Sequence, residues 1–137
     1  MAETHSITRV SGVLGDKPYL TQLTFGRHAL VADEPEAMGG ADAGASPFAL
    51  VLSGLVACTA ITLRMYAERK GISLSKVRVD AVHHQAPEGA YVERTLFIEG
   101  ELDEAQRNRM AEISERTPVT LALKGGMDIR TRLHAAA

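Results

Sequence analysis

The chain contains one cysteine, Cys58, and this residue decides which sulfur chemistry is open to the protein. A single thiol forms no disulfide within the chain and no cysteine-based zinc cluster, so a redox reaction at Cys58 needs a thiol from outside. The reactive form is the thiolate, which is stabilised by a helix N-terminus or by a nearby Arg, Lys or His⁺. A cysteine among apolar residues is instead a small buried hydrophobe. The local sequence VACTAIT leaves both interpretations open.

Cys58 lies in the longest apolar stretch of the chain, which covers residues 48–63 and is followed by Arg64. A helix that spans a bilayer needs about 20 apolar residues, and this stretch is shorter. We therefore predict a buried helix of a globular protein, with no membrane as a partner.

The ends of this helix are marked by residues that favour helix termini. Ser46-Pro47 predicts the start, because Ser accepts a free backbone N–H and Pro has none to leave unpaired, and Gly71 predicts the end. The central helix should thus cover residues 46–71. Cys58 then lies about three turns from the start, beyond the reach of the helix dipole, unless the helix breaks at Ser53-Gly54.

The histidines and acidic residues do not form a metal-binding pattern. His83 and His84 are adjacent on a predicted strand and so point to opposite faces, and the other histidines are scattered. The acidic run at residues 33–36 lacks the spaced oxygen ligands and the central Gly of a calcium loop, which favours a solvated loop. We predict no metal and no cofactor.

The periodicity of apolar residues and the residues typical of helix caps predict the secondary structure of the rest of the chain. Asp103 with Gln106 forms a capping box, and Thr117-Pro118 starts a second short helix. Alternation of apolar and polar residues predicts the strands. The predicted elements are N-terminal strands within residues 1–31 (4–13 and 18–31), a loop over 32–45, a hairpin over 74–100, helices over 103–123 and a last strand over 126–134.

The composition restricts the partners and the location. The 137 residues suit a single domain, residues 1–137, and the fifteen Lys and Arg against seventeen Asp and Glu form no basic segment. Nucleic acid is therefore excluded as a partner. The N-terminus has neither the basic start nor the apolar stretch of a secretory signal, so we expect the protein in the cytoplasm.

Mixed helices and adjacent strands joined by short turns predict an α+β fold with largely antiparallel sheets. A helix that is apolar all round is hard to bury in so small a domain. We therefore predict a homodimer, in which a second copy helps to cover the first half of the helix.

Two segments resemble the OsmC and organic hydroperoxide resistance family. They are GGADAGASPFALVLSGLVACTAITLRMYAERKG and IEGELDEAQRNRMAEISERTPVTLAL, and the resemblance runs from about residue 26 to residue 133. It implies an OsmC-like fold, with antiparallel sheets packed on a long central apolar helix, in an intertwined homodimer. It also implies a role in oxidative-stress defence, with Cys58 at the position of the family's reactive cysteine.

The chain departs from this family at two positions. Thr117 stands where the resemblance implies a second cysteine that closes a disulfide with the first, and Ala49 stands where it implies a glutamate that orients an arginine. The corresponding arginine is Arg9 or Arg27, of which we prefer Arg27.

Two functions follow from these observations. The first is a thiol-dependent organic hydroperoxide reductase, a peroxidase without the second cysteine, in which Cys58 and Arg27 act and an external thiol is the reductant. The second is a non-catalytic protein of the same fold that binds a small apolar ligand around Cys58 at the dimer interface.

Overall fold

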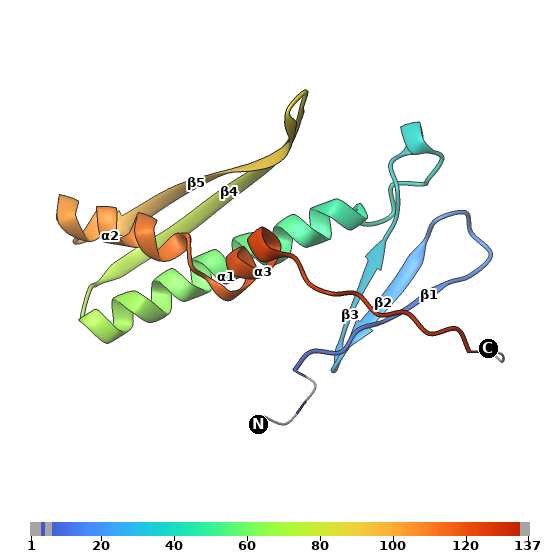
Figure 1. Ribbon diagram of the computed structural model, residues 1–137, viewed down its shortest axis with the longest axis horizontal. Coiled ribbons are helices and arrows are strands. Elements are labelled where there is room, and N and C mark those ends of the chain that lie inside the picture. The colour runs from blue at the N-terminus through green and yellow to red at the C-terminus, as the bar shows by residue number, and fades with distance from the viewer. Residues whose placement is uncertain (1–3, 5–6, 135–137) are drawn as a thin grey trace. The chain divides into compact units, whose positions relative to one another are not determined.

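The structure is a computed structural model that describes residue 4 and residues 7–134. It has the predicted α+β architecture, with antiparallel sheets and a long helix (Figure 1). The chain divides into two compact units, Met1–Val51 and Leu52–Ala137, and the single domain expected from the sequence stays a prediction. The elements are β1 (Ser11–Leu14), β2 (Thr21–Phe25), β3 (His28–Ala32), the 3-10 helix η1 (Glu36–Met38), α1 (Pro47–Lys70), β4 (Leu74–Ala86), β5 (Gly89–Gly100), α2 (Glu104–Ser114) and α3 (Pro118–Gly125).

The first unit contains a three-stranded antiparallel sheet in the order β1-β2-β3. This corrects the single strand predicted over 18–31, because the chain reverses at Gly26, whose φ of 59° favours glycine, and β2 and β3 lie on either side. The strand predicted over 4–13 is also shorter, since β1 begins at Ser11. Ser11 pairs with Thr24, one residue before the end of β2, so the residues before Val10 have no β2 residue opposite them.

The loop after β3 is built around a buried carboxylate. Asp33 is only 3% exposed, which corrects the prediction of a solvated acidic run at this position. Its carboxylate accepts backbone N–H bonds from Glu34 at 2.8 Å, Ala41 at 3.2 Å and Ala43 at 3.1 Å. These bonds, that from Ala43 foremost, hold the pKa of Asp33 below its ordinary value.

The long helix α1 begins and ends at the residues that the capping pattern indicated. The backbone N–H of Ala49 donates to Ser46 Oγ at 3.3 Å, and Pro47 is the first helical residue. Gly71, with a φ of 67°, follows the last turn, and the Ile72 N–H donates to the Ala67 carbonyl at 2.9 Å. The helix continues through Ser53-Gly54, so the break considered there is not present.

The core of the second unit forms around the later half of α1. Leu63 and Ala67 are 0% and 1% exposed, and they pack with Leu74 of β4 and Met110 of α2. Figure 1 shows α1 running alongside the β4–β5 hairpin. The hairpin and α2 cover one side of α1, and the four buried residues recur every fourth position along it: Leu55, Thr59, Leu63 and Ala67.

The opposite side of α1 remains apolar and exposed, with Ile61 at 54% and Met65 at 58%. By length and composition alone, a helix of this kind could cross a membrane, but core helices of soluble proteins meet the same criterion. Within one chain, α1 is thus covered on one side only.

The C-terminal half of the second unit consists of a hairpin and two capped helices. In the hairpin β4 pairs antiparallel with β5, and the turn Pro87-Glu88 joins them. Asp103 and Gln106 form the predicted capping box of α2, and Thr117 caps α3. The strand predicted over 126–134 is corrected, because in the described part of the chain no strand pairs with this segment, and alternation alone does not make a ladder.

Candidate functional site

Cys58 lies half-buried in the middle of α1, as the sequence predicted. Its Sγ atom is 4.0 Å from the hydroxyl oxygen of Thr62, one turn further along the helix. Because α1 is continuous from Pro47, Cys58 lies about three turns from the helix start and gains nothing from exposed backbone N–H groups there. Any stabilisation of its thiolate must therefore come from side chains.

The side chains proposed to act with Cys58 lie in different parts of the chain. Arg27 is in the turn between β2 and β3, and Arg9 precedes β1, so both belong to the first unit, whereas Cys58 belongs to the second. The pairing of Arg27 with Cys58 stays a prediction. Ala49, in the first turn of α1, has only a methyl group and offers no acid to orient an arginine.

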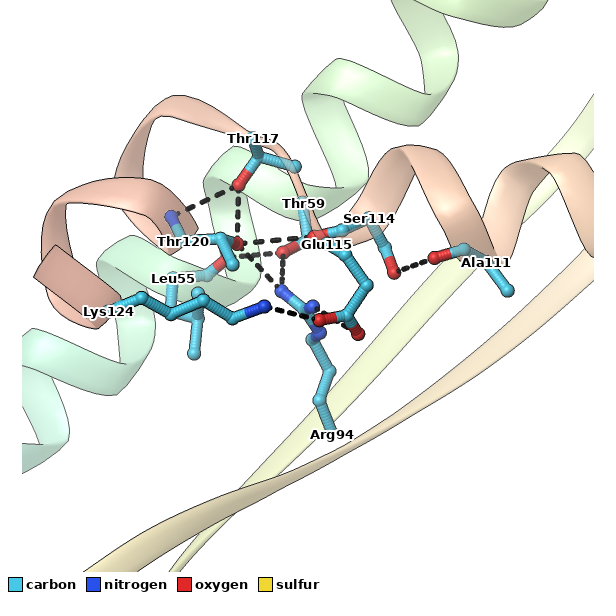
Figure 2. Close-up of polar contacts among 9 residues, drawn as sticks. All are labelled: Leu55, Thr59, Arg94, Ala111, Ser114, Glu115, Thr117, Thr120 and Lys124. Carbon is cyan, nitrogen blue, oxygen red and sulfur yellow. Dashed lines mark hydrogen bonds and ion pairs between the residues drawn. The ribbon is translucent and has the colours of Figure 1, made fainter.

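Thr117, where the family resemblance implies a second cysteine, belongs to a polar cluster inside the second unit. We call this group the Arg94 cluster, and Figure 2 shows its members, which come from α1, β5, α3 and the end of α2. They are Thr59, Arg94, Ser114, Glu115, Thr117, Thr120 and Lys124.

The guanidinium of Arg94 is the centre of the cluster. It extends from β5 toward the helices, and its side chain is 11% exposed (Figure 2). Nη1 donates to the hydroxyl oxygens of Thr59 at 3.1 Å and Thr120 at 2.9 Å, and Nη2 donates to Glu115 Oε2 at 3.4 Å. The cation on β5 is thus bonded to α1 and to the segment 115–120, which are far from each other in the sequence.

The threonine hydroxyls continue this network into the protein. Thr120 donates to the Ser114 carbonyl at 3.2 Å, and its hydroxyl lies 2.6 Å from that of Thr117. Because a hydroxyl has one proton, Thr117 donates to Thr120, while it accepts the Thr120 backbone N–H at 3.2 Å. Thr117, Thr120 and Thr59 are all buried. Thr117 therefore has the capping role that the sequence indicated.

The outer edge of the cluster carries an ion pair. Lys124 Nζ lies 2.6 Å from Glu115 Oε1, and both side chains are more than half exposed. The hydrogen bond from Lys124, with a smaller contribution from Arg94, holds the pKa of Glu115 below its ordinary value. Glu115 is thus a carboxylate shared between two cations.

A cavity of about 720 Å³ opens beside the Arg94 cluster. Its walls come from α1, β5, the end of α2 and α3, and Cys58 is not among them. The lining residues are Leu55, Ala90, Tyr91, Val92, Arg94, Thr95, Leu96, Ala111, Ser114, Glu115, Thr120, Leu123 and Lys124. Cys58 does not line this cavity, so it is a different site from the ligand pocket predicted around Cys58 at the dimer interface, which stays a prediction.

Arg94 was not among the residues predicted from the sequence, although β5 carries a signal for it. In β5 the inward-facing positions alternate as Val92, Arg94, Leu96 and Ile98, so a charged residue interrupts an otherwise apolar face. A charge on the core face of a strand requires a partner and is a reason to look for one. Thr59 and Thr120 are too distant in sequence to have been identified as those partners.

The family profile described as OsmC-like protein matches residues 39–132. The chain belongs to the OsmC-like family. The matched region contains α1 with Cys58, the β4–β5 hairpin, α2 and α3, and therefore every residue of the Arg94 cluster. A comparison with curated proteins gives no match.

Solved structures show the same fold at low sequence identity. The OsmC-like protein from Mycoplasma pneumoniae is 20% identical, with a TM-score of 0.76 over 89% of this chain and 90% of that one. An organic hydroperoxide resistance protein OsmC from Legionella pneumophila is 22% identical, with a TM-score of 0.65 over 90% and 93%. The organic hydroperoxide resistance protein OhrB of Bacillus subtilis is 20% identical, with a TM-score of 0.60 over 90% and 94%. At these identities the likeness shows the fold alone.

Proposed function

We propose that this OsmC-like protein acts in oxidative-stress defence as a single-cysteine organic hydroperoxide reductase. The observation that carries the proposal is the position of Cys58, half-buried on α1 beside the Thr62 hydroxyl, within the region matched by the family. The proteins from Legionella pneumophila and Bacillus subtilis, which bear the name of organic hydroperoxide resistance, support the choice of substrate.

In the proposed reaction the Cys58 thiolate attacks the terminal oxygen of the hydroperoxide. The O–O bond breaks, the alkoxide takes up a proton to leave as an alcohol, and the sulfur becomes a sulfenic acid. An external thiol then displaces water to form a mixed disulfide, and a second thiol releases Cys58 as a thiol together with the oxidised reductant. With one cysteine in the chain, both reducing equivalents come from outside.

Two side chains are proposed to support the thiolate. The Thr62 hydroxyl, 4.0 Å from Sγ, would donate a weak hydrogen bond once the thiol loses its proton. Arg27 would supply the positive charge that lowers a thiol pKa, in the role that the family resemblance implies. We also propose a homodimer in the cytoplasm, in which a second copy covers the exposed side of α1.

The test is oxidation of the reduced full-length protein with one equivalent of cumene hydroperoxide, followed by dimedone trapping and intact-mass analysis. We expect one trapped sulfenic acid, absent in Cys58→Ser, and peroxide consumption when dithiothreitol is supplied. Arg27→Gln should slow the oxidation by at least about tenfold, whereas Arg9→Gln should leave its rate unchanged. An unmodified thiol in the wild-type protein would end this proposal.

The cavity beside the Arg94 cluster favours a second candidate function, the non-catalytic binding of a small, largely apolar ligand. Its volume of about 720 Å³ lies within the range of known ligand pockets, roughly 300–1,000 Å³. Because Cys58 does not line this cavity, Cys58→Ala should fold and keep its affinity for such a ligand. Loss of ligand binding in a folded Cys58→Ala variant would place the ligand at Cys58 and not in this cavity, and a wild-type protein that binds no apolar ligand would refute the function.

A further inference from the structure

We propose that the cavity beside the Arg94 cluster binds an organic carboxylate with an apolar tail. The carboxylate would contact Arg94 and Lys124, and the tail would lie along the apolar walls. This inference shares its cavity with the second candidate function and rests on it in that respect alone. It is independent of hydroperoxide reduction at Cys58.

The apolar walls of the cavity are the reason for proposing an apolar tail on the ligand. Leu55 of α1, Val92 and Leu96 of β5, and Leu123 of α3 contribute aliphatic side chains to different walls. Surfaces of this kind bind alkyl groups through the removal of apolar area from water. A fully polar ligand would leave these walls in contact with water.

The charged residues that line the cavity are the reason for proposing a carboxylate head group. Among the lining residues in the described part of the chain, two carry positive charge, Arg94 and Lys124, and one carries negative charge, Glu115. Arg94 is 11% exposed, and its two shortest bonds go to the neutral hydroxyls of Thr59 and Thr120. Its acidic contact, Glu115, is longer at 3.4 Å and 59% exposed. The cluster therefore retains one positive charge for a ligand to neutralise.

The guanidinium is also held in a defined orientation. The hydroxyls of Thr59 and Thr120 accept hydrogen bonds from Nη1 and hold it on one side. Each hydroxyl in turn donates to a backbone carbonyl, Thr59 to Leu55 at 2.7 Å and Thr120 to Ser114 at 3.2 Å. Nη2 points toward the exposed carboxylate of Glu115 (Figure 2). A planar guanidinium held in place recognises a carboxylate well, because their geometries match.

A purely structural role for Arg94 makes a different prediction. If the guanidinium only links β5 to the helices, Glu115 is part of that support. Replacing Glu115 should then cause no increase in ligand affinity. If the cavity binds a carboxylate, Glu115 competes with the ligand for the same cations, and removal of its charge should increase the affinity.

The experiment measures binding of decanoate and of decanol to the full-length protein by isothermal titration calorimetry. We expect saturable binding of decanoate and affinity for decanol that is at least about tenfold lower, because a charged hydrogen bond is lost. Glu115→Gln should bind decanoate about threefold more tightly and Lys124→Gln about threefold more weakly, the scale of an exposed charge pair. Glu112→Gln, which alters the exposed pair with Arg109 on α2, is the matched control and should not change the affinity.

Three results would overturn the proposal: no saturable decanoate binding, equal affinity for decanol, or a Glu115→Gln affinity equal to that of Glu112→Gln. Equal affinity for decanoate and decanol would overturn the carboxylate proposal but would still support the binding of apolar ligands. The experiment therefore distinguishes failure of this proposal from failure of the second candidate function. Cys58→Ser should bind decanoate like the wild type, whether or not hydroperoxide reduction is observed. A loss of binding in Cys58→Ser would contradict the assignment of this cavity.

Discussion

Thr117 shows how one residue can change the chemistry of a site while keeping its local structure. Its side chain is fully buried, with its hydroxyl bonded to both the backbone N–H and the hydroxyl of Thr120. A cysteine here would be a weak hydrogen-bonding group at the start of α3. The hydroxyl instead caps the helix and supports Thr120, which holds Arg94.

Thr117→Val should therefore lower the free energy of unfolding by about 1–2 kcal/mol, since the cap and a buried hydrogen bond are both lost without a change in volume. The measurement is urea unfolding followed by circular dichroism. Thr24→Val, at an exposed position of β2, is the control and should change stability by less than about 0.5 kcal/mol. Equal stability of the two variants would show that the Thr117 hydroxyl contributes nothing.

At the scale of elements, Gly54 within α1 and Gly71 directly after it have opposite conformational requirements. Gly71 follows the last residue of the helix and has a φ of 67°, a backbone conformation that residues with a side chain rarely adopt. Gly54 lies within the helix. Within one chain, an added Cβ has open space at both positions. Any effect of alanine at these sites therefore comes from the backbone.

Gly71→Ala should destabilise the protein by about 1 kcal/mol, because alanine is strained in the left-handed region. Gly54→Ala should stabilise it by about 0.5–1 kcal/mol, because alanine is the better helix former. Thermal unfolding of both variants checks the opposite signs. Gly54 lies seven residues before Ile61, on the side of α1 that the proposed homodimer covers, so a destabilising Gly54→Ala would show that the second copy packs against Gly54. A Gly71→Ala variant as stable as the wild type would contradict the backbone strain at Gly71.

At the scale of the whole molecule, apolar residues remain exposed on α1 and beyond α3. Ile61 and Met65 face outward from α1, and Met127, Ile129 and Leu133 are 75%, 86% and 98% exposed in a segment with strand-like alternation. These residues are the basis of the proposed homodimer, since contiguous exposed apolar surface favours association.

Ile61→Asp should weaken the dimer on the order of a hundredfold in Kd, because an unpaired charge would be buried against the second copy. Sedimentation velocity over a concentration series measures this. Gln85→Asp, which places the same charge at an exposed polar position of β4, should leave the dimer intact. A wild-type protein that sediments as a monomer would refute the dimer itself.

The parts of the molecule that the sequence determined are those made by residues close together in the chain. Ser46-Pro47 and Gly71 bound α1, Asp103 with Gln106 caps α2, and Thr117 caps α3. Each depends on a hydrogen bond or a backbone preference within a few residues, which sequence patterns record directly. The family match likewise depends on such ordered patterns.

Tertiary structure decided the rest. It joins Arg94 to Thr59 and Thr120, 35 and 26 residues away, and it places the cavity beside them and not at Cys58. It also leaves the segment 126–134 without a strand partner in the described chain. These outcomes depend on which distant groups meet, and neither local periodicity nor capping contains that information. Cys58 stands between the two cases, since the sequence placed it on α1 and tertiary contacts determine whether it reacts.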